Sequence, residues 1–350
     1  MTPPRTTSKF RQALTDHTIP YIIAETAYIH EGDPKIFSAI LTKLAEHHCA
    51  DAVKYHILLD VDAYITHAHH LYNLYDTFKL PPNTWENILQ ETKQKGFETI
   101  VLADEKNAID FAANHPDLVT AVELHAIAIN NFEMLDRAKK IPQPVILGVG
   151  GSTQDDIHYA LDYLDRPDIL LTYGFQIYPT KFEYINLNKL TTMQHTYHVP
   201  IGYADHTSWD HKDNTLITVA GFIKGANFIE KHVTLTPGEK RIDYESAISI
   251  YALCEIKRQI ELLTTTLGTG SMELNDYEKA VASNGPMKFT LVATHDLHKG
   301  HTLNPTDITF KRTEPENPIQ QRDYLKILGT QLTTDVKAND SINWTKVKKP

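Results

Sequence analysis

The sequence predicts an α/β fold in which a (β/α)8 barrel is followed by a small β-rich domain. The first observation behind this prediction is a repeated pattern of a short apolar strand, a polar residue at its end, and an amphipathic helix. Eight such strands alternate with helices over about 230 residues, which fits a (β/α)8 barrel. The second observation is a change near Gly285, where short alternating segments replace the helical pattern.

The expected strands are short apolar runs separated by helical patterns. They cover 21–24, 51–53, 99–102, 118–122, 144–147, 168–172, 201–206 and 226–232. Polar residues such as Glu25, Lys54 and Glu123 stand at the ends of these strands. The active site of such a barrel lies at the carboxyl ends of its strands, so we expect these side chains to point into one basin.

The segment 61–82 interrupts this pattern. It holds His67, His69 and His70 together with several aromatic residues and a Pro-Pro pair. These features predict a long loop that folds over the mouth of the barrel. The three histidines are more typical of a solvated loop than of a metal site, because nothing around them fixes a ligand geometry.

A glycine-rich turn at 148–153 is similar to a dinucleotide-binding turn, but it lacks the last glycine of that motif. Thr153 and Asp156 instead predict a capping box at the start of a helix. Turns of this kind can still present backbone N–H groups to an anion. Ser152 and Thr153 are therefore candidate anion-binding residues.

Two histidines at the ends of neighbouring strands are the candidate metal ligands. A helical pattern separates the strand that ends in His206 from the strand that ends in His232, which predicts a parallel pair with both rings at the same end. Neutral imidazoles bind zinc, manganese or iron, and an adjacent carboxylate such as Asp205 or Glu230 can orient a ring or share a ligand place. The alternative is that each histidine simply caps a loop.

Composition narrows the class of protein. The chain has 350 residues, 41% of them hydrophobic, and a formal net charge of −10, which argues against nucleic acid as the main partner. No apolar run reaches the length of a membrane span, and the first residues carry no apolar export signal. Cys49 and Cys254 are the only cysteines, without metal or redox spacing, so we expect a reducing cytoplasm.

Three segments are expected along the chain. A barrel domain covers 1–264, a Thr/Gly-containing linker covers 265–284, and a small β-rich domain covers 285–350. A domain of this size has barely enough core to fold alone, so we expect it to pack against another surface.

With these residues in view, the chain resembles the sialic acid synthase family, which joins a metal-dependent (β/α)8 barrel to a C-terminal antifreeze-like (SAF) domain. The residues that carry the resemblance are 24–25 with 30–33, 50–54, 178–180 with 186–187, 202–207, 225–226, 230–232, 291–293, 299–300 and 311–312. Each motif is weak alone, but their order and spacing together are specific. The resemblance implies an enzyme that condenses phosphoenolpyruvate with an N-acylated mannosamine or related aldose to give a nonulosonic acid such as sialic acid.

The resemblance also implies roles for single residues. His206 and His232 match the histidines that hold a divalent ion, Mn²⁺ or Mg²⁺, which polarises the sugar aldehyde. Glu25 matches a carboxylate that places the substrates and the attacking water, and Lys54 matches a lysine that meets the carboxylate of phosphoenolpyruvate.

Further matches lie on the sugar side. Two residues, Tyr178 and Asp243, match groups that lie near the sugar in the family. Asn186 belongs to one of the motifs that carry the resemblance. Arg312 matches an arginine that reaches from the small domain into the site of the partner subunit, so the resemblance implies a domain-swapped homodimer.

The chain departs from the family on the phosphate side. Glu123 stands where the family has a lysine, Gly148 stands in place of a serine, and Ala204 replaces the serine before Asp205. A phosphate needs cations and hydroxyl donors, so a glutamate at 123 opposes phosphate binding by charge as well as by the lost contact.

Three interpretations follow from these departures. The chain is a synthase with a rebuilt phosphate pocket that uses Ser152 and Thr153, or a member of the family that acts on a different, less anionic co-substrate, or a non-catalytic sugar-binding protein. Retention of His206, His232, Glu25 and Lys54 counts against the third.

Overall fold

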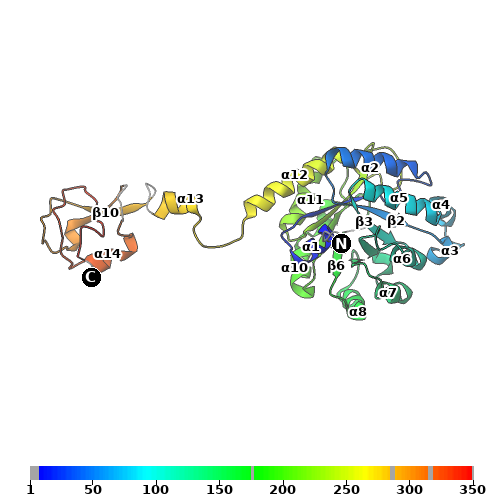
Figure 1. Cartoon of the computed structure of the whole chain (residues 1–350), viewed down its shortest axis with the longest axis horizontal. Coiled ribbons are helices and arrows are strands. Elements are labelled where there is room, and N and C mark those ends of the chain that lie inside the picture. The colour runs from blue at the N-terminus through cyan, green and yellow to red at the C-terminus, as the bar shows by residue number, and fades with distance from the viewer. Residues whose placement is uncertain (1–7, 175–176, 284–287, 314–317, 349–350) are drawn as a thin grey trace, which may run out of the picture. The chain divides into compact units, whose positions relative to one another are not determined.

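The computed structural model describes residues 8–174, 177–283, 288–313 and 318–348. The chain divides into two compact units, Met1–Leu267 and Gly268–Pro350 (Figure 1). Each unit is described by itself below. Within the described residues, no helix is both long and apolar enough to cross a membrane.

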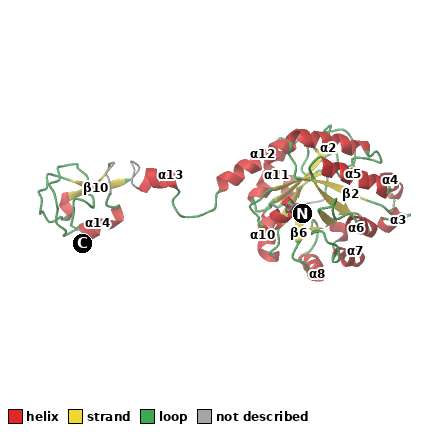
Figure 2. Cartoon of the chain, in the orientation of Figure 1, coloured by secondary structure: helices red, strands yellow, loops and turns green. Residues whose placement is uncertain are grey.

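The first unit contains a closed barrel of eight parallel strands, which confirms the predicted fold class. Each strand pairs with the next in the sequence, and β8 pairs with β1 to close the sheet (Figure 2). The strands are β1 (Tyr21–Glu25), β2 (Ala52–Ile57), β3 (Glu98–Ala103), β4 (Ala121–Leu124), β5 (Val145–Gly148), β6 (Ile169–Tyr173), β7 (Ile201–Asp205) and β8 (Phe228–Thr234). A short strand β9 (Ile248–Ser249) pairs in parallel with the end of β8.

Helices surround this barrel and bury their apolar faces against it. They are α1 (Lys9–Thr15), α2 (Lys35–His47), α3 (Val61–Tyr64), α4 (Tyr72–Phe78), α5 (Pro82–Gln94), α6 (Lys106–Ala113), α7 (Phe132–Ala138), α8 (Gln154–Leu164), α9 (Phe182–Ile185), α10 (Asn188–Tyr197), α11 (Asn214–Ile223) and α12 (Ile250–Leu267), with a 3-10 turn η1 (Ala126–Ala128). The predicted capping box of Thr153 and Asp156 begins α8.

The segment 61–82 is not one irregular loop, because it contains α3 and α4. Its aromatic residues give these short helices a buried face: Phe78 stacks on Tyr28, which follows β1, and Tyr75 contacts the same ring edge-on. His67, His69 and His70 are exposed, as expected for residues in contact with solvent.

Alternation along the strands places two kinds of side chain inside the barrel. The lower layer is apolar and is closed from below by Phe10 and Ala13 of α1. It comprises Tyr21, Ile23, Ala52, Ile100, Ala121, Ile146, Leu170 and Phe228. Two residues further along the strands, the inward positions reach the carboxyl ends, and on β1, β2, β4, β6 and β8 they are polar. The lower layer therefore forms a dry floor for a polar pocket.

The second unit has its own small core. Strands β10 (Phe289–Ala293) and β11 (Ile308–Arg312) pair antiparallel, and Leu291, Ile319 and Ile342 are among its fully buried residues. Its other elements are α13 (Asp276–Glu278), the π-helical turn η2 (Lys279–Ser283), the 3-10 turns η3 (Pro305–Asp307) and η4 (Gln321–Asp323), and α14 (Tyr324–Ile327). The small β-rich domain expected from the sequence is present.

Candidate active site

A pocket opens at the carboxyl ends of the barrel strands and is lined by the inward-facing strand tips. These residues are Glu25, Lys54, His56, Leu102, Glu123, His125, Gly148, Gly150, Thr172, Gly174, Tyr178, Ala204, His206, Glu230 and His232. Every barrel strand contributes at least one of them. The structure therefore brings most of the strand-end residues expected from the sequence into one basin.

Lys54 lies at the centre of this basin and is held by three carboxylates. Its Nζ is 2.8 Å from Glu25 Oε2, 2.8 Å from Glu123 Oε2 and 2.8 Å from Glu230 Oε1. An ammonium group has three protons to donate. One of them is donated to Glu123 Oε2, and Glu25 and Glu230 lie at ion-pair distance from the same nitrogen.

The charges of this cluster do not balance. Burial opposes the charged form of Lys54, but Glu123 and Glu230 outweigh it and raise the pKa of the ammonium group. Burial, the largest cause, and the nearby Glu123 raise the pKa of Glu230, although Lys54 acts in the opposite direction. The Oε2 atom of Glu230 has no hydrogen-bond partner among the described residues. The cluster therefore has an excess of negative charge that a cation would offset.

His206 and His232 lie side by side next to this cluster, and His232 pairs with Glu25 across β1 and β8. Their ring centroids are 5.0 Å apart, and the ring of Tyr178 lies 4.8 Å from His206 and 5.6 Å from His232. Burial, followed by the charge of His206, lowers the pKa of His232 well below its ordinary value, so its imidazole is neutral. The backbone carbonyl of His206 accepts hydrogen bonds from Thr180 N–H and Ser246 Oγ, both at 2.8 Å.

These two histidines fit a divalent metal ion. The Nδ1 atom of His232 is buried without a hydrogen-bond partner in the described part of the chain, and a neutral imidazole nitrogen is a metal ligand. Over the described ranges, no group of three or more His, Cys, Asp or Glu side chains is arranged to hold a metal ion. An ion at this place would have the two histidines as its protein ligands and open positions for substrate and water.

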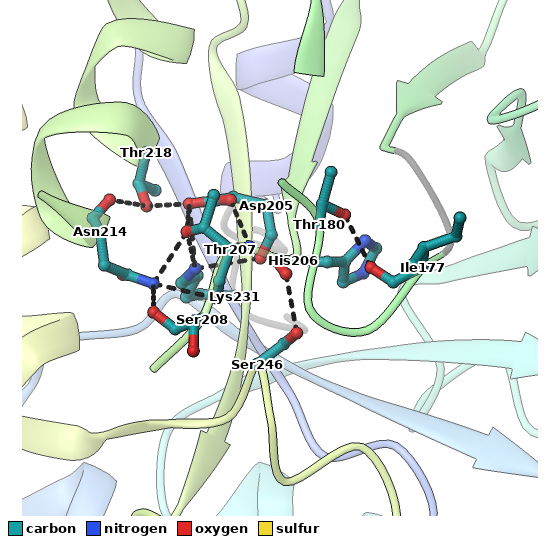
Figure 3. A network of polar contacts seen from close by, with 10 residues as sticks. All are labelled: Ile177, Thr180, Asp205, His206, Thr207, Ser208, Asn214, Thr218, Lys231 and Ser246. Atoms are coloured by element: carbon teal, nitrogen blue, oxygen red, sulfur yellow. Dashed lines mark hydrogen bonds and ion pairs between the residues drawn. The ribbon is translucent and has the colours of Figure 1, made fainter. Parts of the chain in front are cut away.

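Asp205 does not line the pocket, although it was expected as a substrate-binding residue. Its side chain lies on the outer face of β7, where it meets Lys231 Nζ at 2.9 Å and accepts a hydrogen bond from Thr218 Oγ1 at 2.5 Å (Figure 3). Burial raises the pKa of Asp205, but Lys231 and Thr218 outweigh it and the pKa is lowered. Asp205 faces outward because side chains alternate between the two faces of a strand, and the inward positions on either side of it are those of Ala204 and His206.

Lys231 completes this outer cluster. It donates to the backbone oxygen and carboxylate of Asp205 and to Thr207 Oγ1, and Thr207 also accepts from Asn214 Nδ2 of α11 (Figure 3). The cluster ties the residues beside His206 and His232 to each other and to α11. It therefore holds the ends of β7 and β8 that carry the two histidines.

His56 and His125 face the pocket but were not among the residues expected to act there. Nε2 of His56 is 3.4 Å from Glu25 Oε1, and its Nδ1 is 3.4 Å from Asp104 Oδ1. Tyr28 donates its hydroxyl to Asp104. The signal was present in the sequence, because His56 and His125 stand two residues after the pocket-facing Lys54 and Glu123, on the same side of their strands.

Two residues expected near the sugar do lie close to the pocket. Tyr178 lines it, and the pKa of Tyr178 is raised by burial and then by the negative charge of Asp243. Burial also raises the pKa of Asp243, whose charge interacts with His56. Asn186, in contrast, is exposed at the C-terminus of α9 and is not among the lining residues.

Ser152 and Thr153 lie outside the central basin. Ser152 lines a separate groove between α8 and α10, and the hydroxyl of Thr153 donates to Asp156 in the capping box. Neither residue is therefore among those that line the pocket at the strand ends. Arg312 is on β11 of the second unit, opposite Phe289.

The glycine at 148 is required by its surroundings. A Cβ atom there would lie 2.9 Å from the backbone nitrogen of Ala126 and 3.4 Å from Glu123 Oε1. A serine would push on the backbone after β4 and on the carboxylate that holds Lys54. Gly148 and Glu123 are thus in close contact on this wall of the pocket.

Two curated relatives match almost the whole chain. An uncharacterized protein of Methanocaldococcus jannaschii is 27% identical over 93% of this chain and 93% of its own length. The N,N'-diacetyllegionaminic acid synthase of Campylobacter jejuni is 26% identical over 92% of this chain and 98% of its own length.

Solved structures and family models agree with the two-unit organisation. A putative spore coat polysaccharide biosynthesis protein E from Chromobacterium violaceum superimposes with a TM-score of 0.81 at 18% identity, covering 94% of this chain and 99% of that chain, so the fold is shared. The SAF domain model matches residues 290–348. The NeuB family model matches residues 42–272, and the chain therefore belongs to the NeuB family.

Proposed function

We propose that this chain joins a three-carbon carboxylic acid to the aldehyde carbon of an N-acylated mannosamine or related aldose, giving a nonulosonic acid. Membership of the NeuB family and the similarity to a nonulosonic acid synthase support this reaction type. The observation that carries the proposal is the single pocket that contains His206, His232, Tyr178, Glu25 and Lys54.

A divalent ion, Mn²⁺ or Mg²⁺, held by His206 and His232 would polarise the sugar aldehyde as a Lewis acid. The residues around it position the substrates. Tyr178 presents its ring beside both histidines, and Asp243 lies near enough to influence the pKa of Tyr178. We place the sugar on the side of the pocket that Tyr178 lines.

Glu25 is the candidate catalytic carboxylate. It is fully buried, it accepts a hydrogen bond from Ala27 N–H at 3.0 Å, and it contacts both Lys54 and His56. These contacts fix the orientation of its two oxygens. A carboxylate that is held in place beside an imidazole is suited to move a proton to or from a substrate.

Phosphoenolpyruvate is the three-carbon donor that the resemblance to sialic acid synthases implies. A second candidate is a less anionic donor, and the three carboxylates around Lys54 favour it. A dianionic phosphate beside Glu123 meets a like charge in a buried site, which is unfavourable.

We also propose that the protein works as a homodimer in the cytoplasm, with Arg312 of the second unit completing the site of the partner. In that case a mixture of Arg312→Ala and Glu25→Ala chains regains part of the activity, because a mixed dimer contains one site with both residues intact. Failure to complement, with mixed dimers shown to form by mass spectrometry, would remove Arg312 from the site of a neighbouring subunit.

The reaction is tested by incubating the full chain with Mn²⁺, N-acetylmannosamine and either phosphoenolpyruvate or pyruvate. Mass spectrometry of the products detects the mass of a nonulosonic acid, and His206→Ala serves as the control that removes it. Absence of a carbon–carbon bonded product with both donors would contradict the proposal and leave a sugar-binding protein.

A further inference from the structure

We propose that Cys49 and Cys254 are an oxidation site, at which a small disulfide such as oxidised glutathione converts the two thiols into an intramolecular disulfide bond. The two cysteines are about 200 positions apart in the sequence, so their spacing carries no redox signal. Both are free thiols in this structure. The fold brings them together where α12 packs beside α2 (Figure 1).

Two hydrogen bonds hold α12 against the residues that follow α2. The thiol of Cys49 donates to the backbone oxygen of Ile250 at 3.7 Å. The ammonium group of Lys257 donates to the backbone oxygen of His48 at 2.6 Å. Positions 250 and 257, which are two helical turns apart, are therefore both anchored at residues 48–49.

Cys254 lies between these two anchors on the same face of α12. Residues three and four positions apart in an α-helix are neighbours on its surface, and Ile250, Cys254 and Lys257 have this spacing. The side chain of Cys254 therefore faces the segment that holds Cys49. A hydrogen bond between the two thiols agrees with this placement, because it is the second cause, after burial, that raises the pKa of Cys49.

The two thiols differ in access, and this difference sets the order of reaction. Cys254 is partly exposed, whereas Cys49 is 1% exposed. A dissolved oxidant therefore reaches Cys254 first, and Cys49 reacts only with a sulfur that is already beside it. The charge of Lys257 favours the thiolate of Cys49, which is the form that attacks a disulfide.

The reaction balances with one molecule of the small disulfide. The Cys254 thiolate attacks one of its sulfurs, releases one small thiol and becomes a mixed disulfide. The Cys49 thiolate then attacks Cys254 Sγ and releases the second small thiol. The protein loses two electrons and two protons, and the small disulfide gains both as it is reduced to two thiols.

The new bond joins parts of the barrel that are distant in the sequence. Cys49 precedes β2, and α12 follows β8 and β9 and ends the first unit. A bond that closes a loop of about 200 residues restricts the unfolded chain and so stabilises the folded one. We expect the oxidised protein to have a Tm about 5–10 °C above that of the reduced protein.

The first experiment treats the reduced full chain with oxidised glutathione, unfolds it, blocks free thiols with N-ethylmaleimide and measures the intact mass. We expect wild type to lose both thiols, carry no glutathione and remain a single chain. Cys49→Ser should keep one glutathione at Cys254, and Cys49→Ala should do the same if both fold alike. Cys254→Ser should react at least tenfold more slowly, because Cys49 is buried.

Three results for wild type would each overturn the proposal: two glutathione adducts, two unreacted thiols, or two chains linked through Cys254. Thermal unfolding of the oxidised and reduced protein then measures the expected rise in Tm, which dithiothreitol should reverse. An unchanged Tm in a chain shown to contain the bond would remove its stabilising role.

A second experiment tests the anchor beside the two thiols. Lys257→Gln loses the bond to His48 and the positive charge near Cys49, so we expect the disulfide to close about threefold to tenfold more slowly. Arg258→Gln is the matched control, because Arg258 is the next residue of α12, is 61% exposed and pairs with Glu255. Equal rates of closure in the two variants would contradict the arrangement of α12 on which the proposal rests.

Discussion

The barrel contains two buried lysines, one on the outer face of the sheet and one on the inner face. They differ in the number of carboxylates that surround them. Lys231 lies outside the strands with one carboxylate, Asp205, and its remaining contacts are to a carbonyl and a hydroxyl oxygen. Lys54 lies inside with three carboxylates. Asp205 has a lowered pKa and Glu230 a raised one. The outer pair of one lysine and one carboxylate has no net charge and stabilises the fold. The inner cluster has more carboxylates than lysines, which indicates a site that binds a charged ligand.

The outer pair can be broken by removing its cation. Lys231→Met leaves Asp205 buried without a counter-charge, and we expect a loss of about 3–5 kcal/mol in the free energy of unfolding. Urea denaturation followed by circular dichroism measures it. The double variant Lys231→Met with Asp205→Asn should recover part of the loss, because no charge is then left unpaired. An unchanged unfolding midpoint in the single variant would show that the pair does not support the fold.

The metal site that we propose on the inner face has only two histidine ligands, so the loss of either one should weaken metal binding. His206→Ala or His232→Ala should weaken Mn²⁺ binding by about 100-fold or more. Isothermal titration calorimetry with Mn²⁺ measures the change, and His67→Ala, an exposed histidine, is the control. Equal affinity in wild type and both site variants would place the ion elsewhere.

Two histidines of the first unit, His30 and His125, should respond to acid differently from the outer ion pair. Burial lowers the pKa of His30 and of His125 to about 4, from an ordinary value of 6.5. The folded state then binds fewer protons than the unfolded state, so this stability is complete above pH 6.5 and is lost as the pH falls towards 4. Asp205, with its lowered pKa, stays ionised over that range.

We therefore expect the free energy of unfolding to fall by about 1–2 kcal/mol for each of these histidines between pH 7 and pH 5. Urea unfolding at both pH values measures the fall, which should be smaller in His125→Asn than in His17→Asn, an exposed control. The same pH dependence in the two variants would mean that His125 is not held neutral.

The barrel was predictable because its signals are local. Alternation of apolar strands and amphipathic helices gave all eight strands, and Thr153 with Asp156 gave a helix start. The segment 61–82 was predicted as a loop because its short helices depend on aromatic contacts with Tyr28, which is distant in the sequence. Contacts of this kind leave no periodic pattern.

The residues that line the pocket could be predicted from the sequence, but the ion pairs between them could not. Strand ends placed Glu25, Lys54 and Glu123 in one basin, yet the partners of Lys54 come from three other strands and their geometry is set by the closed barrel. Asp205 was assigned to the basin because it precedes His206, and the one-residue alternation that turns it outward was overlooked. Ser152 was misplaced because the turn after β5 leads it away from the barrel axis, into the groove beside α8.

The central claim is that Glu123 opposes the binding of a phosphate in the pocket. Isothermal titration calorimetry of phosphoenolpyruvate into the Mn²⁺-bound protein at neutral pH tests it most directly, with wild type, Glu123→Ala and the exposed control Glu133→Ala. We predict that Glu123→Ala, which removes the carboxylate that accepts a hydrogen bond from Lys54, binds phosphoenolpyruvate about tenfold more tightly than wild type and the control, or about 1.4 kcal/mol. Micromolar binding of phosphoenolpyruvate to wild type, unchanged in Glu123→Ala, would contradict the claim.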